Sequence, residues 1–283
     1  MITRFAPSPT GRLHIGHAYS ALFAYEKAMK SGGRFILRIE DIDEGRCRPE
    51  FIDGIYEDLH WLGLEWDEPV RLQSQHMDDY KNALDTLESS GLLYPCFCTR
   101  KDIRDEIDRA RGAPHGPEGT LYPGICRSLG TEERTRKMAD GIPYALRLDM
   151  EAALEHIHHA SLFFHDHAHG EIHATPEILG DVVLARKDSP TSYHLSVCVD
   201  DAVQGITCVT RGEDLLYATH LHRLLQELLS LPVPDYHHHP LLTDETGQRF
   251  AKRNKSVTLE EMRHEGYTAG DLKRDIQMRL SAA

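Results

Sequence analysis

Short apolar runs alternate with helical patterns over the first 95 residues of this 283-residue chain. Ile2–Phe5 and Phe35–Ile39 are runs typical of short buried strands. Pro49–Leu62 and Asp78–Leu87 have helical patterns, with a proline in the first turn of one and Gly91 just beyond the other. Because strands alternate with helices, we expect an α/β fold with a parallel sheet and crossover helices.

The pattern changes between about residues 95 and 176, where loops rich in glycine and proline flank a charged helix expected at Lys101–Arg111. We interpret this stretch as an insertion that splits the nucleotide-binding fold. Strands are then expected at Val182–Ala185 and Tyr193–Val199, and a helix from about Ala218 to Leu229. The predicted units are two halves of one domain at 1–95 and 176–235, the insertion at 96–175, and a loop with a short helical end at 236–283.

Composition is that of an ordinary globular protein, with 40% hydrophobic and 27% charged residues. No apolar run is long enough to span a bilayer, and the N-terminus has no signal-peptide character, so we expect a cytoplasmic protein with no membrane partner. The net charge of −13 argues mildly against a nucleic-acid partner, because phosphate contacts need lysine and arginine. A local basic surface could still form near Arg249, Lys252, Arg253 and Lys255.

Candidate chemistry begins at the N-terminus, with His14-Ile15-Gly16-His17. Gly16 permits a tight turn, and the two histidines would share one face of the helix that begins there. Two such histidines are more often packing or solvated residues, but here they follow a strand and a Gly/Pro/Ser loop. A helix N-terminus with imidazole donors suits a polyphosphate. The sequence contains neither a Walker-type loop nor Gly-x-Gly-x-x-Gly, so the phosphate site must be of another kind.

Four motifs in order carry a family resemblance: Arg4–Gly11 with the His-Ile-Gly-His tetrapeptide, Arg38–Asp43, Tyr193–Asp201 leading into Gly205–Thr207 and Arg211–Asp214, and Arg249–Arg253. Together they resemble class I glutamyl-tRNA synthetases over nearly the whole chain. The resemblance implies a Rossmann-like parallel sheet, split by a zinc-bearing insertion and followed by a mobile Lys-Met-Ser-Lys-Ser-type loop.

Length narrows the comparison. Only residues 254–283 follow Arg253, too few for an independent anticodon-binding domain, so we expect none. The chain resembles the truncated glutamyl-queuosine tRNA(Asp) synthetases, which implies tRNA-independent activation of L-glutamate with ATP. The glutamate would then pass to the queuosine base of the tRNA(Asp) anticodon. Two alternatives stay open: a minimal glutamyl-tRNA synthetase charging the 3′ end of tRNA(Glu), and a catalytically silent tRNA-binding paralog. We expect a monomer, although the sequence does not reveal oligomeric state.

The resemblance assigns catalytic roles to His14, His17 and Lys252, which would stabilise the phosphate charges as pyrophosphate leaves. Mg²⁺ would accompany ATP. The implied ATP-binding residues are His14, Gly16, His17, Arg249, Phe250, Ala251, Lys252 and Arg253. Arg249 and Ala251 stand where lysine and serine are usual, and Ala251 loses a hydrogen bond of about 0.5–1.5 kcal/mol.

The resemblance also implies a glutamate site formed by Arg4, Phe5, Ala6, Pro7, Ser8, Glu40, Tyr193 and Arg211. Glu40 can pair with the α-ammonium group, because a carboxylate is its natural counterion. We expect Arg4 with Tyr193 to bind the side-chain carboxylate and Arg211 to bind the other. Isolated arginines and glutamates usually form surface ion pairs, so the prediction depends on the motifs around them.

Cys96-Phe97-Cys98 and the later Cys126 supply three soft ligands suited to Zn²⁺. The resemblance to the glutamyl-queuosine enzymes implies one structural zinc ion held by Cys96, Cys98, Tyr122 and Cys126. His115 is a competing fourth ligand, and three free buried cysteines are the alternative.

The remaining histidines cluster at positions 156, 158, 159, 165, 167, 169 and 173 and at 237–239. We expect them to be solvated or to lie on strand surfaces, because no spacing matches a metal site. Cys47, Cys198 and Cys208 are expected to be small buried apolar residues.

Overall fold

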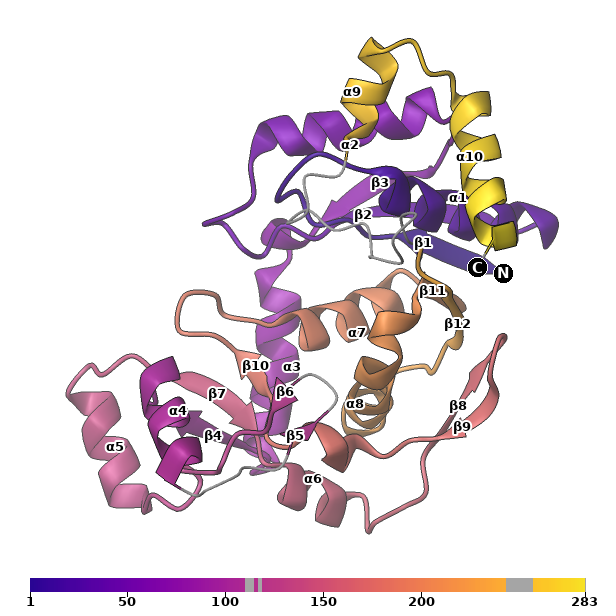
Figure 1. Cartoon of the computed structure of the whole chain (residues 1–283). Helices are drawn as coiled ribbons and strands as arrows, with labels where there is room; N and C mark the ends of the chain where they lie inside the picture. Colours follow the sequence, from indigo (N-terminus) through magenta and orange to yellow (C-terminus); the bar gives the residue numbers. More distant parts are fainter. Residues whose placement is uncertain (110–114, 117–118, 243–256, 283) are drawn as a thin grey trace.

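The computed structural model describes residues 1–109, 115–116, 119–242 and 257–282. Three parallel strands form its first sheet in the order β1 (Ile2–Phe5), β2 (Arg34–Ile39) and β3 (Asp67–Leu72). On the other side of β1 lie β11 (Cys208–Gly212) and its parallel neighbour β12 (Asp235–His239). The predicted α/β fold with a parallel sheet is therefore confirmed (Figure 1).

Strands β1 and β11 lie side by side, and the Thr207 N–H donates to the Ile2 carbonyl at 3.0 Å. The chain thus leaves β1 toward β2 and later returns on the opposite side of β1. In open α/β sheets, the crevice outside the carboxyl ends of two such strands is where ligands bind. The fold points to this crevice before any side chain is considered.

Most helices fall where the sequence predicts them. The helices that follow the first three strands and the eleventh are α1 (Ile15–Lys30), α2 (Pro49–Trp61), α3 (Met77–Ser89) and α8 (Leu216–Leu228). In α1 the core face is built largely from alanines, which combine high helix propensity with close packing.

The prediction of a strand at Tyr193–Val199 is wrong, because these residues begin helix α7 (Tyr193–Val203). The Ser192 hydroxyl caps this helix by accepting the Leu195 N–H at 3.5 Å. Every residue from Leu195 to Asp201 is buried, its polar residues included, so this stretch of α7 has no solvent-exposed face to reveal a helical period. A short apolar run of this kind does not distinguish a buried helix from a buried strand.

The stretch between the two halves of the fold carries a second, antiparallel sheet in the order β10 (Val183–Ala185), β7 (Ala145–Leu148) and β4 (Leu93–Cys96). Around it lie the predicted charged helix and further short elements: α4 (Arg100–Arg109), β5 (His115–Gly116), β6 (Gly119–Thr120), α5 (Thr131–Ala139), α6 (Met150–His156) and a 3-10 turn, η2 (Pro176–Leu179). The hairpin of β8 (Phe163–Asp166) and β9 (Gly170–His173) reaches back to β12, where Asp166 is in register with Tyr236.

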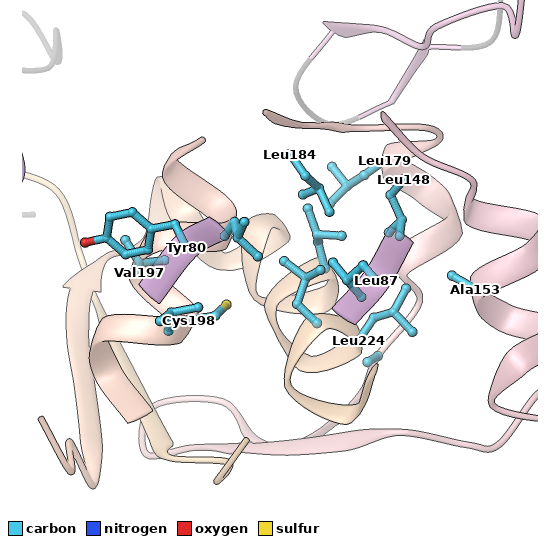
Figure 2. Close-up of a cluster of buried hydrophobic side chains, with 14 of the residues drawn as sticks. Tyr80, Leu87, Leu148, Ala153, Leu179, Leu184, Val197, Cys198 and Leu224 are labelled. Atoms are coloured by element: carbon cyan, nitrogen blue, oxygen red, sulfur yellow. The ribbon is translucent and has the colours of Figure 1, made fainter. Parts of the chain in front are cut away.

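Two large hydrophobic clusters hold the chain together. One joins α3, the antiparallel sheet, α7 and α8, and Figure 2 shows Tyr80 and Leu87 of α3 beside Val197, Cys198 and Leu224. The insertion therefore shares its core with the helices that flank the crevice. This packing fixes α7, whose first turn lines the site described below.

The other cluster joins α1, α2 and the first sheet to α9 (Leu259–His264) and α10 (Ala269–Ala282). The predicted helical end is thus part of the N-terminal core. Thr258 forms an isolated bridge with His14, and the Leu259 N–H donates to the Leu13 carbonyl at 2.9 Å. Within the described ranges, no helix combines the length and apolar character needed to cross a bilayer.

Candidate active site

An open pocket of about 420 Å³ lies at the carboxyl ends of β1 and β11, in the crevice where the strand order reverses. The structure brings together there all eight residues that the resemblance implies for a glutamate site, and His17 of α1 joins them. The pocket lining is completed by Thr10, Ser20, Thr210, Gly212 and Leu215.

Arg211 is a buried cation whose hydrogen-bond partners among the described residues are all neutral. Its Nη1 donates to the Tyr193 hydroxyl at 3.3 Å and to His222 Nδ1 at 3.2 Å. Its Nη2 donates to the Thr219 hydroxyl at 2.6 Å and its Nε to His238 Nε2 at 3.1 Å. No carboxylate among the described residues lies within ion-pair distance of this guanidinium. A buried charge without a counterion is costly, so the pocket favours an anionic ligand beside Arg211.

The imidazoles around Arg211 stay uncharged at neutral pH. Burial, reinforced by the charge of Arg211, lowers the pKa of His222 well below its usual value. The same two causes lower the pKa of His238 to about 4 and that of His194, which contacts His222 at 3.1 Å, to about 4. Because a neutral imidazole offers one acceptor nitrogen, His222 and His238 can accept hydrogen bonds from Arg211 without repelling it.

Arg4 and Glu40 belong to a different, ionic cluster. The Arg4 Nε donates to Asp201 at 3.0 Å, and Arg38 bridges Asp201 at 2.7 Å and Glu40 at 3.2 Å. Tyr193 is therefore bonded to Arg211, whereas Arg4 is paired with Asp201. This arrangement differs from the expected partnership of Arg4 with Tyr193.

The positive charges near Glu40 do not fully compensate the burial of its carboxylate. Burial raises its pKa above the ordinary value, although the nearby Arg38 and Arg4 oppose that shift. A further cation beside the Glu40 carboxylate would favour its ionised form. An ammonium group in the pocket would meet this need.

The two histidines of the His-Ile-Gly-His turn lie together, with ring centroids 3.7 Å apart. His14 caps α1, and its Nδ1 accepts the Gly16 N–H at 3.1 Å. The Nδ1 of His17 accepts the His14 N–H at 3.1 Å. With both Nδ1 atoms accepting, the neutral rings carry their protons on Nε2 and can act as donors there. The prediction that the rings share one face is confirmed.

The loop part of the predicted ATP site lies outside the described residues. This covers Arg249, Phe250, Ala251, Lys252 and Arg253, and also Lys255. The chain resumes at Val257, and Thr258 is already at the His14 cap.

The three cysteines of the insertion form a compact cluster. The Sγ atoms of Cys96, Cys98 and Cys126 all lie within 4.8 Å of one another. The Tyr122 hydroxyl lies 3.4 Å from the sulfur of Cys96 and 3.5 Å from that of Cys98. Tetrahedral zinc with Zn–S bonds of about 2.3 Å places its ligands roughly 3.8 Å apart, so this donor set fits the ion. The side chain of His115 is outside the described structure.

The expectation for the 237–239 histidines is wrong for His238 and His239, which are each 1% exposed. His238 is bonded to Asp166 and Arg211, whereas His239, on the other face of β12, packs against Tyr19 and Phe23 of α1. Sequence reasoning also did not identify Thr219, His222 and Asp166 as neighbours of the site. Cys198 and Cys208 are buried as predicted, whereas Cys47 is only partly buried.

The buried imidazoles predict a pH-dependent stability. His194, His222 and His238 have lower pKa values in the fold than in the unfolded chain, so between about pH 6.5 and 4 the unfolded chain binds protons that the fold does not. Stability is therefore lost as the pH falls through this window. We expect the melting temperature to drop by about 5 °C or more from pH 7 to pH 5. Thermal unfolding across pH measures this, and the slope should flatten in His222→Gln; an unchanged slope would contradict the assignment.

Comparisons with known proteins agree with this geometry. The family model described as class I tRNA synthetases (E and Q), catalytic domain, matches residues 1–279. The glutamyl-Q tRNA(Asp) synthetase of Rhodobacter capsulatus is 47% identical, with 97% of this chain and 99% of that protein covered. The glutamyl-Q tRNA(Asp) synthetase of Nitratidesulfovibrio vulgaris is 42% identical, with 95% of this chain and 83% of that protein covered.

A solved glutamate-tRNA synthetase from Elizabethkingia anophelis superposes with a TM-score of 0.79 at 29% identity. The alignment covers 95% of this chain and 59% of that one, so the chain spans well under two thirds of the longer enzyme. The glutamate–tRNA ligase of Aquifex aeolicus is 40% identical, and the match covers 54% of that protein. The chain therefore belongs to the class I tRNA synthetases of the glutamate and glutamine type and is a ligase of the branch whose members are named glutamyl-Q tRNA(Asp) synthetases.

Proposed function

We propose that the chain activates L-glutamate with ATP, without tRNA, and transfers it to the queuosine base of tRNA(Asp). The observation that carries this proposal is the buried Arg211 cation, whose partners in the described part of the chain are all neutral, in a pocket that also holds Glu40. The names of the full-length relatives support the acceptor. In this reading the enzyme works in the cytoplasm, where tRNA is found.

The glutamate side chain would bind at Arg211 and Tyr193. Arg4 is already neutralised by Asp201, so its charge discriminates weakly between glutamate and glutamine. Arg211 has no such partner among the described residues, and a side-chain carboxylate would supply the missing counterion. A buried charge pair is strongly favoured over one charge left alone, so glutamine should be rejected. Glu40 would bind the α-ammonium group, and Arg4 would face the α-carboxylate.

Activation is an in-line displacement. An α-carboxylate oxygen of glutamate attacks the α-phosphorus of ATP, the bond to the β-phosphate oxygen breaks, and pyrophosphate leaves with that electron pair. The Nε2–H groups of His14 and His17 would stabilise charge on the phosphates, with Lys252 and Mg²⁺. Since Thr258 is anchored at His14, the six residues back to Lys252 reach at most roughly 20 Å. Lys252 can therefore approach the same phosphates.

Transfer completes the reaction. A hydroxyl of the queuosine base attacks the acyl carbon of glutamyl-adenylate, an ester forms, and AMP leaves. Cys96, Cys98, Tyr122 and Cys126 would hold one structural zinc ion, which when bound closes a four-ligand site without an open position.

Labelled glutamate and ATP, incubated with tRNA(Asp) that carries or lacks queuosine, test the proposal. We expect glutamate-dependent ATP–pyrophosphate exchange without tRNA, and transfer only to the modified tRNA. Transfer to the 3′ end of tRNA(Glu) would instead identify a minimal glutamyl-tRNA synthetase, the second candidate suggested by relatives named glutamate–tRNA ligase. No exchange at all would identify a catalytically silent paralog.

A further inference from the structure

We propose that Asp166 and His238 act as a positioning pair that orients Arg211 toward a bound carboxylate, so that the insertion hairpin contributes directly to amino-acid recognition. This inference rests on the proposed function of the Arg211 pocket. It concerns two residues that do not line the pocket and that touch no substrate.

The contacts form a continuous buried chain. Asp166 Oδ2 lies 2.6 Å from His238 Nδ1, and His238 Nε2 lies 3.1 Å from Arg211 Nε. Thr219, whose hydroxyl accepts from Arg211 Nη2, also approaches His238 Nε2 at 3.1 Å. Asp166 and Thr219 are fully buried and His238 is 1% exposed, so water does not compete for these bonds.

The direction of each hydrogen bond is fixed. A guanidinium has only donors, so His238 Nε2 must accept from Arg211. The pKa of Asp166 is lowered because hydrogen bonds from His238 and from backbone N–H groups outweigh the effect of burial, so its carboxylate only accepts. His238 Nδ1 must therefore carry the proton. Asp166 holds the ring in the single tautomer that can accept from Arg211.

Asp166 itself is held by the β8–β9 turn. Its Oδ1 accepts the N–H groups of Ala168 at 2.8 Å and His169 at 3.0 Å, whereas its Oδ2 accepts both the backbone N–H of His238 at 3.1 Å and the ring Nδ1–H. In Asp166→Asn the amide oxygen would keep the two turn N–H groups, and its NH₂ would face His238 Nδ1. A donor there forces the opposite tautomer, whose Nε2–H clashes with Arg211 Nε–H. The variant keeps the turn and reverses the hydrogen-bond direction at the ring, and it also loses the bond from the His238 backbone N–H, which His238→Leu retains.

The test is ATP–pyrophosphate exchange with glutamate and ATP varied separately, in Asp166→Asn and His238→Leu. Loss of an oriented bond to a charged group corresponds to a rise of about 10–100-fold in KM for glutamate. The KM for ATP should stay within about twofold, because His14 and His17 are untouched. His238→Gln retains an acceptor near Nε2 and should recover much of the loss. In the double variant, Asp166→Asn should add nothing to His238→Leu.

His237→Leu is the matched control, because His237 lies on the same strand but packs against Phe23 and His167. Its kinetics should resemble those of the wild type. Circular dichroism and thermal unfolding verify that each variant folds. Glutamate KM values within twofold of wild type in folded Asp166→Asn and His238→Leu would overturn the inference. A wild-type enzyme without glutamate-dependent exchange would instead refute the proposed function.

Discussion

Arg211→Gln is expected to lower kcat/KM for glutamate about a thousandfold in ATP–pyrophosphate exchange. Glutamine keeps some hydrogen bonding to Tyr193 but removes the one cation of the pocket that lacks a carboxylate partner among the described residues. An unpaired carboxylate in such a site costs about 3–5 kcal/mol, and that range corresponds to a factor of about 10²–10³ or more. The loss should appear mainly in the kinetic constants measured with glutamate as the varied substrate, and the KM for ATP should change little.

Substrate preference gives the sharper measurement. Arg211→Gln should also reduce the preference of the enzyme for glutamate over glutamine. Without the Arg211 guanidinium, the pocket no longer favours the carboxylate of glutamate over the uncharged amide of glutamine. Arg274→Gln, which removes an exposed arginine on α10, is the matched control and should leave both values unchanged. Full discrimination against glutamine in a folded Arg211→Gln enzyme would contradict the role of Arg211.

Cys98→Ser is expected to release zinc and to destabilise the insertion. Among the residues that the structure describes, the local hydrophobic cluster at the cysteines has three buried members, Tyr94, Cys96 and Cys126, too few to hold the segment without a further link. A structural zinc ion contributes its binding energy to folding. Metal analysis should fall from one zinc per chain to near zero, and the melting temperature should fall with it. Chelation of the wild type should have the same effect.

Two further variants make the zinc assignment specific. Cys47→Ser changes a cysteine outside the cluster and should keep one zinc per chain. Tyr122→Phe should weaken zinc binding if the phenol is the fourth ligand, whereas His115→Ala should not. A stable wild-type protein without zinc would refute the site, and loss of zinc only in His115→Ala would reassign its fourth ligand.

Much of the fold follows from local patterns. The strand at Ile2–Phe5, the helix that begins at the His-Ile-Gly-His tetrapeptide and the helices around Pro49 and Ala218 lie where the sequence predicts them, because each has an amphipathic pattern or a capping signal. Helix α7 is the exception, because its residues from Leu195 to Asp201 are all buried. Periodicity reports contrast between faces, and a helix buried on all sides has none.

The candidate site, too, is only partly predictable from the sequence. Residues of the motifs, such as Arg4 and Glu40, are found together in the pocket because the family pattern carries that information. Asp166 and His238 belong to no motif, and 72 positions separate them in the sequence. Only the pairing of β8 with β12 brings them together. The histidines at 237–239 are predicted to be solvated because composition does not reveal that strand β12 is largely buried.

The last helices of the chain also bear on how the protein folds. Leu272 and Ile276 of α10 share a core with α1, and Leu259 is hydrogen-bonded to Leu13. The N-terminal segments can therefore complete this core only after the helices α9 and α10 have been synthesised. Contacts between segments that lie far apart in the sequence slow folding. The bridge between His14, the cap of α1, and Thr258 can form only once the segment that carries α9 has been synthesised.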